Sequence, residues 1–139
     1  MVESKTTTPS SDTDIDILAR IQHELSSYPP YMADRHRVHF SVNDGVVVVS
    51  GYVKSPITET FVVNRVRNVP GVSDVMDDDF YNDEEIRLDV GRVVPPGVMV
   101  TIEYGAVILS GNLPEGTTVE QLVHKVGQVP GVHHVVTSF

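Results

Sequence analysis

The strongest constraint on the fold of this chain is an internal repeat with a period of sixty residues. The stretch from Val42 to Gly51 returns as Ile102 to Gly111, and the later Val69-Pro70-Gly71-Val72 returns as Val129-Pro130-Gly131-Val132. Aligned without a gap, residues 42–75 and 102–135 are identical at 12 of 34 positions, and most other positions exchange one apolar residue for another. A register of this length indicates a duplicated domain.

Length and composition suit two small globular domains. The chain has 139 residues, of which 40% are apolar and 21% charged, as is ordinary for soluble proteins. Domains of half this length bury only about 60% of the surface of their unfolded chain. The sequence contains no cysteine, which excludes disulfides, thiolate metal sites and cysteine nucleophiles.

The charge is acidic and unevenly distributed. The formal net charge is −9; residues 1–75 contain seven Lys or Arg and nine Asp or Glu, whereas residues 76–139 contain three and ten. Binding to nucleic acid depends on Lys and Arg side chains that neutralise phosphates, so we expect no nucleic-acid partner. The same acidic charge opposes binding to an anionic lipid surface.

The N-terminal segment shows no targeting signal in the sequence as given. Residues 1–13 are polar, with several Thr and Ser, and lack the apolar run of a signal peptide. No stretch approaches the roughly 18 apolar residues that span a bilayer. We therefore expect residues 1–13 to form a flexible tail and the protein to be cytoplasmic, or periplasmic if a leader was removed.

The first copy, residues 14–79, is expected to fold as helix, strand, strand, helix, strand. A helix capped by Asp14 stops ahead of Pro29-Pro30, which cannot continue it. Strands at 38–42 and 46–52 flank a tight turn, a helix opens at Ser55-Pro56, and a third strand starts at Val72. The buried helix faces are expected to contain Ile17, Leu18, Ile21 and Leu25, and then Ile57, Phe61, Val62, Val66 and Val69.

The second copy, residues 80–139, repeats this order with a shorter first helix, capped by Asn82. Strands at 98–102 and 106–113 precede a helix with a capping box from Thr117 to Glu120, and a last strand spans 132–137. Its buried helix faces are expected to contain Ile86, Val90, Val93 and Val94, and then Val119, Leu122, Val123, Val126 and Val129. The predicted fold class is α+β, with two tandem αββαβ units, each a small three-stranded mixed sheet with helices packed on one face.

The repeated residues resemble the pattern of the BON domain, named for bacterial osmotic-shock and nodulation proteins. The pattern consists of a valine-rich strand ending in Ser-Gly, a helix, and then Val-Pro-Gly-Val. The resemblance covers about residues 14–139 and implies turn and strand-end roles for the motif residues Gly45, Ser50, Gly51, Pro70 and Gly71, and for Gly105, Ser110, Gly111, Pro130 and Gly131.

The resemblance implies a non-enzymatic binding module without a cofactor. BON domains are associated with phospholipid surfaces, with protein assemblies and, in a soluble relative, with potassium. We expect a protein partner or self-association, because valine-rich edge strands pair readily with further strands. Two alternatives stay open: a cation-responsive protein that binds potassium or calcium, and a stress protein that binds membrane phospholipid.

An acidic run between the copies is a candidate cation site. Its candidate ligands are Asp77, Asp79, Asp83 and Glu85, because hard cations bind several carboxylate oxygens at one point. The run lacks the spacing and the glycine of an EF-hand, and adjacent residues on a strand point to opposite faces. A solvated linker between the copies is the favoured interpretation.

The sequence predicts no catalytic centre. His36 and His39 are three residues apart on an expected strand and His133 and His134 are neighbours, so each pair is expected to point to opposite sides. The serines of the two Ser-Gly pairs lack the preceding glycine of a hydrolase elbow. We therefore expect surface or interface histidines and no enzymatic activity.

Four tyrosines lie in expected loops or at strand ends. Tyr28, Tyr31, Tyr81 and Tyr104 either cover the core or anchor a partner or a lipid headgroup. Of these two roles, packing over the core is favoured.

Overall fold

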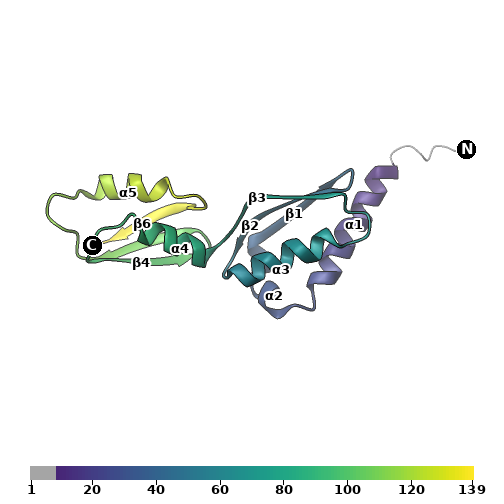
Figure 1. Cartoon of the computed structure of the whole chain (residues 1–139), viewed down its shortest axis with the longest axis horizontal. Coiled ribbons are helices and arrows are strands. Elements are labelled where there is room, and N and C mark those ends of the chain that lie inside the picture. Colours follow the sequence, from purple (N-terminus) through teal and green to yellow (C-terminus); the bar gives the residue numbers. More distant parts are fainter. Residues whose placement is uncertain (1–8) are drawn as a thin grey trace, which may run out of the picture. The chain divides into compact units, whose positions relative to one another are not determined.

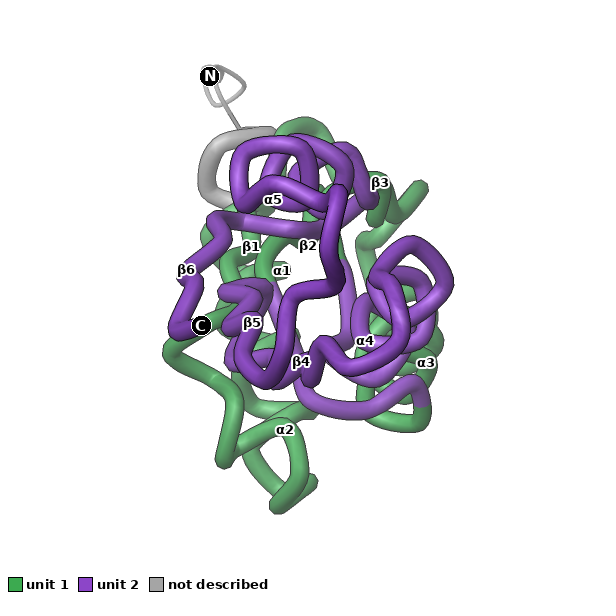
Figure 2. Tube along the Cα trace, turned by 90° about the vertical axis from the view of Figure 1, so that its left-hand side faces the viewer, with its two compact units in different colours: residues 1–51, 57–80 green, residues 52–56, 81–139 purple. Residues whose placement is uncertain are grey.

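The computed structural model describes residues 9–139 and divides the chain into two compact units, coloured separately in Figure 2. Unit 1 comprises the residues up to Gly51 and residues 57–80, and unit 2 comprises residues 52–56 and 81–139. The helices and strands, drawn in Figure 1, are α1 (Pro9–Leu25), α2 (Pro29–Asp34), the 3-10 helix η2 (Arg35–Arg37), β1 (Val38–Asn43), β2 (Val46–Val53), α3 (Pro56–Arg67), β3 (Asp74–Asn82), α4 (Asp83–Gly91), β4 (Val98–Glu103), β5 (Ala106–Gly111), α5 (Val119–Gly127) and β6 (His134–Ser138).

Both sheets have three strands, and the second strand of each predicted hairpin lies at the centre. Their orders are β1-β2-β3 and β4-β5-β6. The antiparallel hairpins pair Phe40 with Val49 and Val100 with Leu109 at equivalent registers, and β6 pairs parallel to β5. Because α5 crosses from β5 to β6, the parallel pairing follows from the long connection that a helix provides. The predicted α+β class with mixed three-stranded sheets is confirmed.

The core of unit 1 lies between its sheet and its two longer helices. Ile17, Ile21 and Leu25 of α1 are fully buried, as their spacing predicts. On the sheet side, Val47 and Val49 of β2 are also fully buried. The remaining contribution comes from the buried residues of α3, which are Thr58, Val62, Val63 and Val66. Ile57 is 73% exposed instead of buried, because it lies in the first turn of α3, where Thr58 faces inward.

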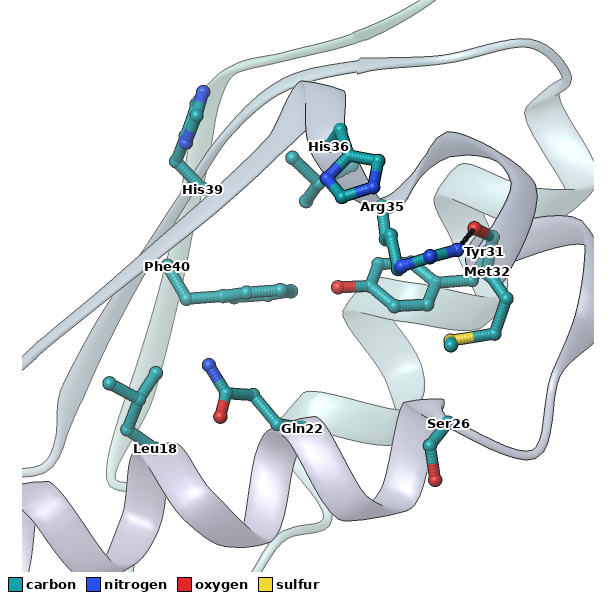
Figure 3. Close-up of a pocket in the computed structure, with 10 residues that line it drawn as sticks. Leu18, Gln22, Ser26, Tyr31, Met32, Arg35, His36, His39 and Phe40 are labelled. Atoms are coloured by element: carbon teal, nitrogen blue, oxygen red, sulfur yellow. Dashed lines mark hydrogen bonds between the residues drawn. The ribbon is translucent and has the colours of Figure 1, made fainter.

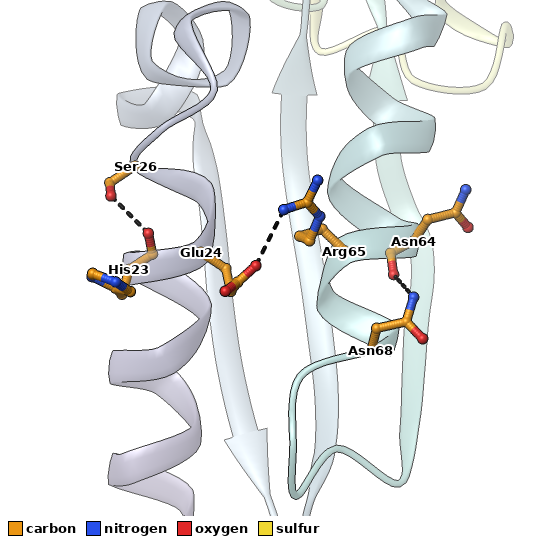
Figure 4. A network of polar contacts seen from close by, with 6 residues as sticks. All are labelled: His23, Glu24, Ser26, Asn64, Arg65 and Asn68. Atoms are coloured by element: carbon orange, nitrogen blue, oxygen red, sulfur yellow. Dashed lines mark hydrogen bonds and ion pairs between the residues drawn. The ribbon is translucent and has the colours of Figure 1, made fainter.

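Helices α1 and α3 are connected on the surface of unit 1 by a polar contact, drawn in Figure 4, and by aromatic contacts. Glu24 of α1 accepts a hydrogen bond from Arg65 of α3 over 3.2 Å. The Arg65 guanidinium also lies 4.6 Å from the centre of the Phe61 ring. Phe61 in turn stacks on Tyr28, with ring centroids 3.7 Å apart. The chain segment after α1 is thus fixed against α3 before α2 begins.

The core of unit 2 follows the same plan with shorter helices. Val107 and Leu109 of β5 are fully buried. They contact a cluster from both helices and the turn after α5, which contains Ile86, Val90, Leu122, Val126 and Val129. Asn82 caps α4 as predicted, because its side chain accepts a hydrogen bond from the Glu85 N–H over 2.9 Å.

Val119, expected on the buried face of α5, is 37% exposed, and three further local features differ from expectation. Helix α1 begins at Pro9 and not at Asp14, since proline is tolerated in the first turn of a helix; residues 1–8 of the expected flexible tail lie outside the described part of the chain. The capping box of α5 involves Thr118 and Gln121, one residue later than Thr117 and Glu120. The segment after Pro29-Pro30 forms α2, because the two prolines occupy its first turn.

Candidate functional site

The acidic run connects the two units, since the boundary between them follows Phe80, but it forms a strand and the start of a helix and not an irregular segment. Asp77 and Asp79 lie on β3, which continues to Asn82. The strand extends through the acidic residues because Val75 and Phe80 on either side of them are buried, which anchors both ends of the segment.

The four candidate cation ligands are divided between two elements. Asp77 and Asp79 belong to β3, whereas Asp83 and Glu85 belong to the first turn of α4. Within residues 9–139 no group of three or more His, Asp or Glu side chains is placed to hold a metal ion. The side chains of the run therefore supply no converging set of oxygen ligands.

Asp83 has a structural role that the sequence analysis missed. Its carboxylate accepts hydrogen bonds from the backbone N–H of Tyr104 over 2.8 Å and of Gly105 over 3.0 Å. The residue is only 8% exposed. Burial raises the pKa of the Asp83 carboxyl above its ordinary value, and the two hydrogen bonds from Tyr104 and Gly105 partly oppose this shift. Glu103 raises the pKa further and Lys54 lowers it.

Asp14 makes the same pair of contacts in unit 1. Its carboxylate accepts hydrogen bonds from the N–H of Asp44 over 2.9 Å and of Gly45 over 3.1 Å. We call each arrangement of one carboxylate and two turn N–H groups a turn clamp. An aspartate in the first helix of each copy, followed by a hairpin turn with glycine, is the signal from which both clamps could have been predicted.

The turns held by the clamps have the backbone conformation that the sequence predicts. Asp44 and Gly45 have φ values of 52° and 81°, and Tyr104 and Gly105 have 46° and 82°. These values define the left-handed turn that joins tightly twisted strands.

The same turns also reach the last part of each unit. The carbonyl of Gly45 accepts a hydrogen bond from the Ser73 N–H over 2.8 Å, and that of Gly105 accepts one from His133 over 2.7 Å. A single turn thus connects the first helix, the hairpin and the approach to the last strand.

The remaining motif residues lie where chain segments approach closely. A Cβ atom on Gly51 would lie 2.0 Å from the carbonyl oxygen of Arg37, and one on Gly111 would lie 2.4 Å from that of Gly97. Ser50 and Ser110 precede these glycines at half-buried positions. Pro70-Gly71 and Pro130-Gly131 follow α3 and α5; the Pro70 carbonyl accepts a hydrogen bond from Arg20, and the Gly131 carbonyl accepts one from Tyr52.

The expected orientation of the histidine pairs is wrong in both copies. His36 lies in η2 and only His39 lies on a strand, so the alternation of a strand does not separate them, and both line one pocket. His133 precedes β6, and its Nδ1 lies 2.9 Å from Nδ1 of His134. A hydrogen bond at this distance requires a proton on one of the two nitrogens.

The four tyrosines are buried or half-buried. Tyr31 is 7% exposed, in α2. Tyr28 stacks on Phe61, and the rings of Tyr81 and Tyr52 lie 5.9 Å apart. Tyr52 and Tyr81 pack against the core of unit 2, whereas Tyr28 and Tyr104 are half-buried.

Each sheet has a face that its helices do not cover, recognisable from the exposure of alternate residues. In unit 2, Thr101 and Val136 lie on either side of Ile108 in register, on the face opposite the buried Val107 and Leu109. Val136 is 45% exposed, and Met99, on the same face of β4, is 65% exposed. We call these residues, Met99, Thr101, Ile108 and Val136, the open face of unit 2.

Unit 1 repeats this arrangement. Val48 lies between the buried Val47 and Val49 on β2 and points to the opposite side. It is 41% exposed, and Met76, which follows the buried Val75 on β3, is 46% exposed. An uncovered sheet face with aliphatic side chains is therefore a property of the duplicated fold.

Unit 1 also contains a pocket of about 480 Å³ (Figure 3), which no motif in the sequence predicted. Its walls come from α1, from the segment containing α2 and η2, and from β1. The lining residues are Leu18, Gln22, Ser26, Tyr31, Met32, Arg35, His36, Val38, His39 and Phe40.

No helix within residues 9–139 has both the length and the apolar character needed to cross a lipid bilayer.

Comparisons with known proteins agree with the duplicated architecture. The C-terminal domain of CdsD, described as the structural protein of the type III secretion system of Chlamydia trachomatis, superposes with a TM-score of 0.58 at 20% identity. The match covers 89% of this chain but only 63% of that structure. A second CdsD structure gives a TM-score of 0.41 at 14% identity and covers 88% of this chain and 90% of its own. The comparison with curated proteins gives no match.

The likeness to the CdsD C-terminal domain shows a shared fold. The comparison with protein families matches the BON domain to residues 13–80 and again to residues 82–139. Together these two matches take up most of the sequence, in agreement with the sixty-residue repeat. The chain therefore belongs to the BON domain family and contains two tandem BON domains.

Proposed function

We propose that this chain is a non-enzymatic binding module that makes protein contacts within an assembly, through the open faces of its sheets. The observation that carries the proposal is the repetition of an uncovered, partly aliphatic sheet face in both units. In unit 2 this face presents Met99, Ile108 and Val136. Apolar side chains rimmed by polar ones are characteristic of surfaces that contact other proteins.

The absence of a catalytic arrangement among the described residues supports a binding role. BON domains are generally non-catalytic, and the two Ser-Gly serines are half-buried on strands. The buried carboxylate of Asp83 is occupied by backbone N–H groups. No described nucleophile, base and orienting acid are brought together.

The partner that we propose first is another copy of the chain. Strand β6 lies at the edge of its sheet and is exposed at four of its five positions, so its backbone and the adjacent open face are accessible together. Exposed sheet edges pair readily with further strands. The similarity in fold to a structural protein of a secretion system also favours a role in an assembly.

The net charge predicts how such self-association depends on salt concentration. Each copy carries a formal charge of −9, so two copies repel each other at low ionic strength. Added salt screens this repulsion, and self-association should therefore strengthen as salt is added. A contact that depended on a basic partner would weaken instead.

Size-exclusion chromatography with light scattering over a hundredfold range of concentration tests the proposal. We expect the mass to rise above the 15.3 kDa of one chain as concentration and salt increase. Val136→Lys places a charge on the open face and should reduce the mass to that of a monomer. Leu88→Lys is the matched control, because Leu88 is a 56% exposed aliphatic residue on α4, away from the sheet.

Two results would contradict the proposal. A mass that stays at 15.3 kDa over the whole range would exclude self-association. An equal loss of association in Val136→Lys and Leu88→Lys would show that the contact does not use the open face.

A further inference from the structure

We propose that the pocket of unit 1 is a binding site for a small organic anion, a carboxylate attached to an aromatic or aliphatic body. Its volume of about 480 Å³ lies within the range of pockets that hold small molecules, about 300–1,000 Å³. The pocket lies entirely within residues of unit 1. It is a separate feature from the open faces of the sheets.

The charge of the pocket opposes that of the chain. Arg35, His36 and His39 line it, and none of its ten lining residues is acidic, although Asp and Glu outnumber Lys and Arg by 19 to 10 in the sequence. Arg37 adds a further cationic group to the same 3-10 helix. A pocket with this lining attracts anions in a protein that otherwise repels them.

Tyr31 provides an unused hydrogen-bonding group inside the pocket. The residue is only 7% exposed, and its hydroxyl makes no hydrogen bond to any side chain or backbone group that the structure describes. Figure 3 shows the hydroxyl directed into the pocket, toward Phe40. Buried polar groups in proteins nearly always have a partner, so this hydroxyl is placed to donate to a ligand.

Arg35 has further donors for the same ligand. One of its guanidinium nitrogens donates to the carbonyl of Met32, which fixes the side chain beside Tyr31. A guanidinium carries five N–H groups in a planar fork that matches the two oxygens of a carboxylate. Arg35 lowers the pKa of the Tyr31 hydroxyl, although burial has the larger, opposite effect and raises it. The two groups are thus electrostatically coupled.

The floor of the pocket is apolar and suits the body of such a ligand. Phe40 and Leu18 lie on one side of the space and Met32 on another, as Figure 3 shows. The rings of Tyr31 and Phe40 are 6.4 Å apart and tilted by 49°. An aromatic or aliphatic group between these side chains would leave its carboxylate near Arg35 and Tyr31.

The segment that completes the pocket is present in only one copy of the duplicated fold. In the turn clamps, Asp14 and Gly45 are 31 residues apart, whereas Asp83 and Gly105 are 22 apart. The difference of nine residues equals the combined length of α2, with six residues, and η2, with three. In unit 2, the next element after α4, which ends at Gly91, is β4, which begins at Val98. Four of the lining residues, Tyr31, Met32, Arg35 and His36, come from this additional segment.

Titration of the 15N-labelled full chain with 2-naphthoate, followed by NMR, tests the inference. We expect saturable shifts of the amide signals of pocket residues such as Leu18 and Phe40. The neutral analogue 2-naphthalenemethanol has nearly the same shape. Its affinity should be lower by a factor of at least about ten, as expected for the loss of a charge-assisted hydrogen bond. Equal binding of the acid and the alcohol would overturn the proposal.

Variants identify the groups that recognise the carboxylate. Arg35→Gln should reduce the affinity for 2-naphthoate by about tenfold, and Tyr31→Phe by severalfold, and both should reduce the affinity for the alcohol less than that for the acid. Arg92→Gln is the control, because Arg92 is an exposed arginine of unit 2 paired with Asp89. If Arg92→Gln weakened binding as much as Arg35→Gln, or if the shifts fell outside the pocket, the attraction would be nonspecific and the site would be refuted.

Discussion

The turn clamps predict a difference between two equivalent aspartates, which can be worked out from burial. In Asp83→Ala, the N–H groups of Tyr104 and Gly105 lose a charged acceptor, and the Gly105 bond is buried. A hydrogen bond to a charged group contributes about 1.5–3 kcal/mol, and an unpaired buried donor costs about 1–3 kcal/mol. Part of this loss is offset because the buried carboxylate no longer has to be desolvated. We therefore expect Asp83→Ala to lower the free energy of unfolding of unit 2 by about 2–3 kcal/mol.

The equivalent substitution in unit 1 should cost less. Asp14 is only half-buried, and its bond to the Asp44 N–H is exposed to solvent, so water can replace the lost acceptor. Asp14→Ala should lower the free energy of unfolding of unit 1 by about 0.5–1 kcal/mol. Asp79→Ala is the control; the Asp79 side chain is exposed on β3, and its removal should change stability by less than about 0.5 kcal/mol.

Urea unfolding followed by two-dimensional NMR measures both effects, since the signals of each unit report its own transition. A two-unit chain need not unfold in one step, so the midpoints are compared unit by unit. If Asp83→Ala destabilised its unit no more than Asp14→Ala, burial would not determine the strength of the clamp and the reasoning would fail.

Three further predictions concern titration, a surface ion pair and the buried tyrosine. Since the pKa of Asp83 is raised above 3.8, the folded state binds this proton more tightly than the unfolded state. The stability of the wild type relative to Asp83→Asn should therefore be greatest below pH 3.8 and fall as the pH rises through the raised pKa; urea midpoints that diverge in the opposite direction would contradict this. Glu24→Gln breaks a pair with Arg65 whose side chains are 45% and 43% exposed, and should cost less than about 1 kcal/mol in thermal unfolding, with a smaller effect at high salt. Tyr31→Phe removes a hydroxyl that has no hydrogen-bond partner among the described residues and should not lower the unfolding free energy measured in urea, whereas a hydroxyl with a structural hydrogen bond would cost about 1 kcal/mol.

The parts of the fold that the sequence predicted are those determined by local chemistry and by repetition. Alternating valines, positive-φ turns such as Asp44-Gly45 and the Ser55-Pro56 helix start require only neighbouring residues. Because each pattern occurs in both copies, an element with a weak pattern in one copy could be predicted from the equivalent element in the other. Burial of Ile17 and Val90 followed from the same patterns.

The features that were missed depend on contacts between segments far apart in the chain. The carboxylate of Asp83 meets a turn 22 residues later, and the one signal for this contact in the sequence is that the first helix of the other copy also contains an aspartate. The extension of β3 through Asp77 and Asp79 depends on Phe80, whose burial only the folded structure shows. The short helix α2 was hidden because its two initial prolines were interpreted only as the end of the preceding helix.

The pocket was missed for a related reason. His36 and His39 were placed on one strand, although η2 separates them. Tyr31 and Arg35 are neighbours within α2 and η2, and they form a pocket only together with residues of α1 and β1 such as Leu18 and Phe40. Sequence patterns of helices and strands carry little information on such a short, irregular segment.

The two clamps have a consequence for how this architecture can change. Each one ties the first helix to the hairpin independently of the chain between them, and that intervening chain is nine residues longer in unit 1 than in unit 2. Insertions at this point are therefore compatible with the rest of the fold. Deleting residues 29–37 from unit 1 should remove the pocket, because four of its ten lining residues come from this segment. The clamped helix and hairpin would keep their arrangement, while the segment between them could change in length and sequence.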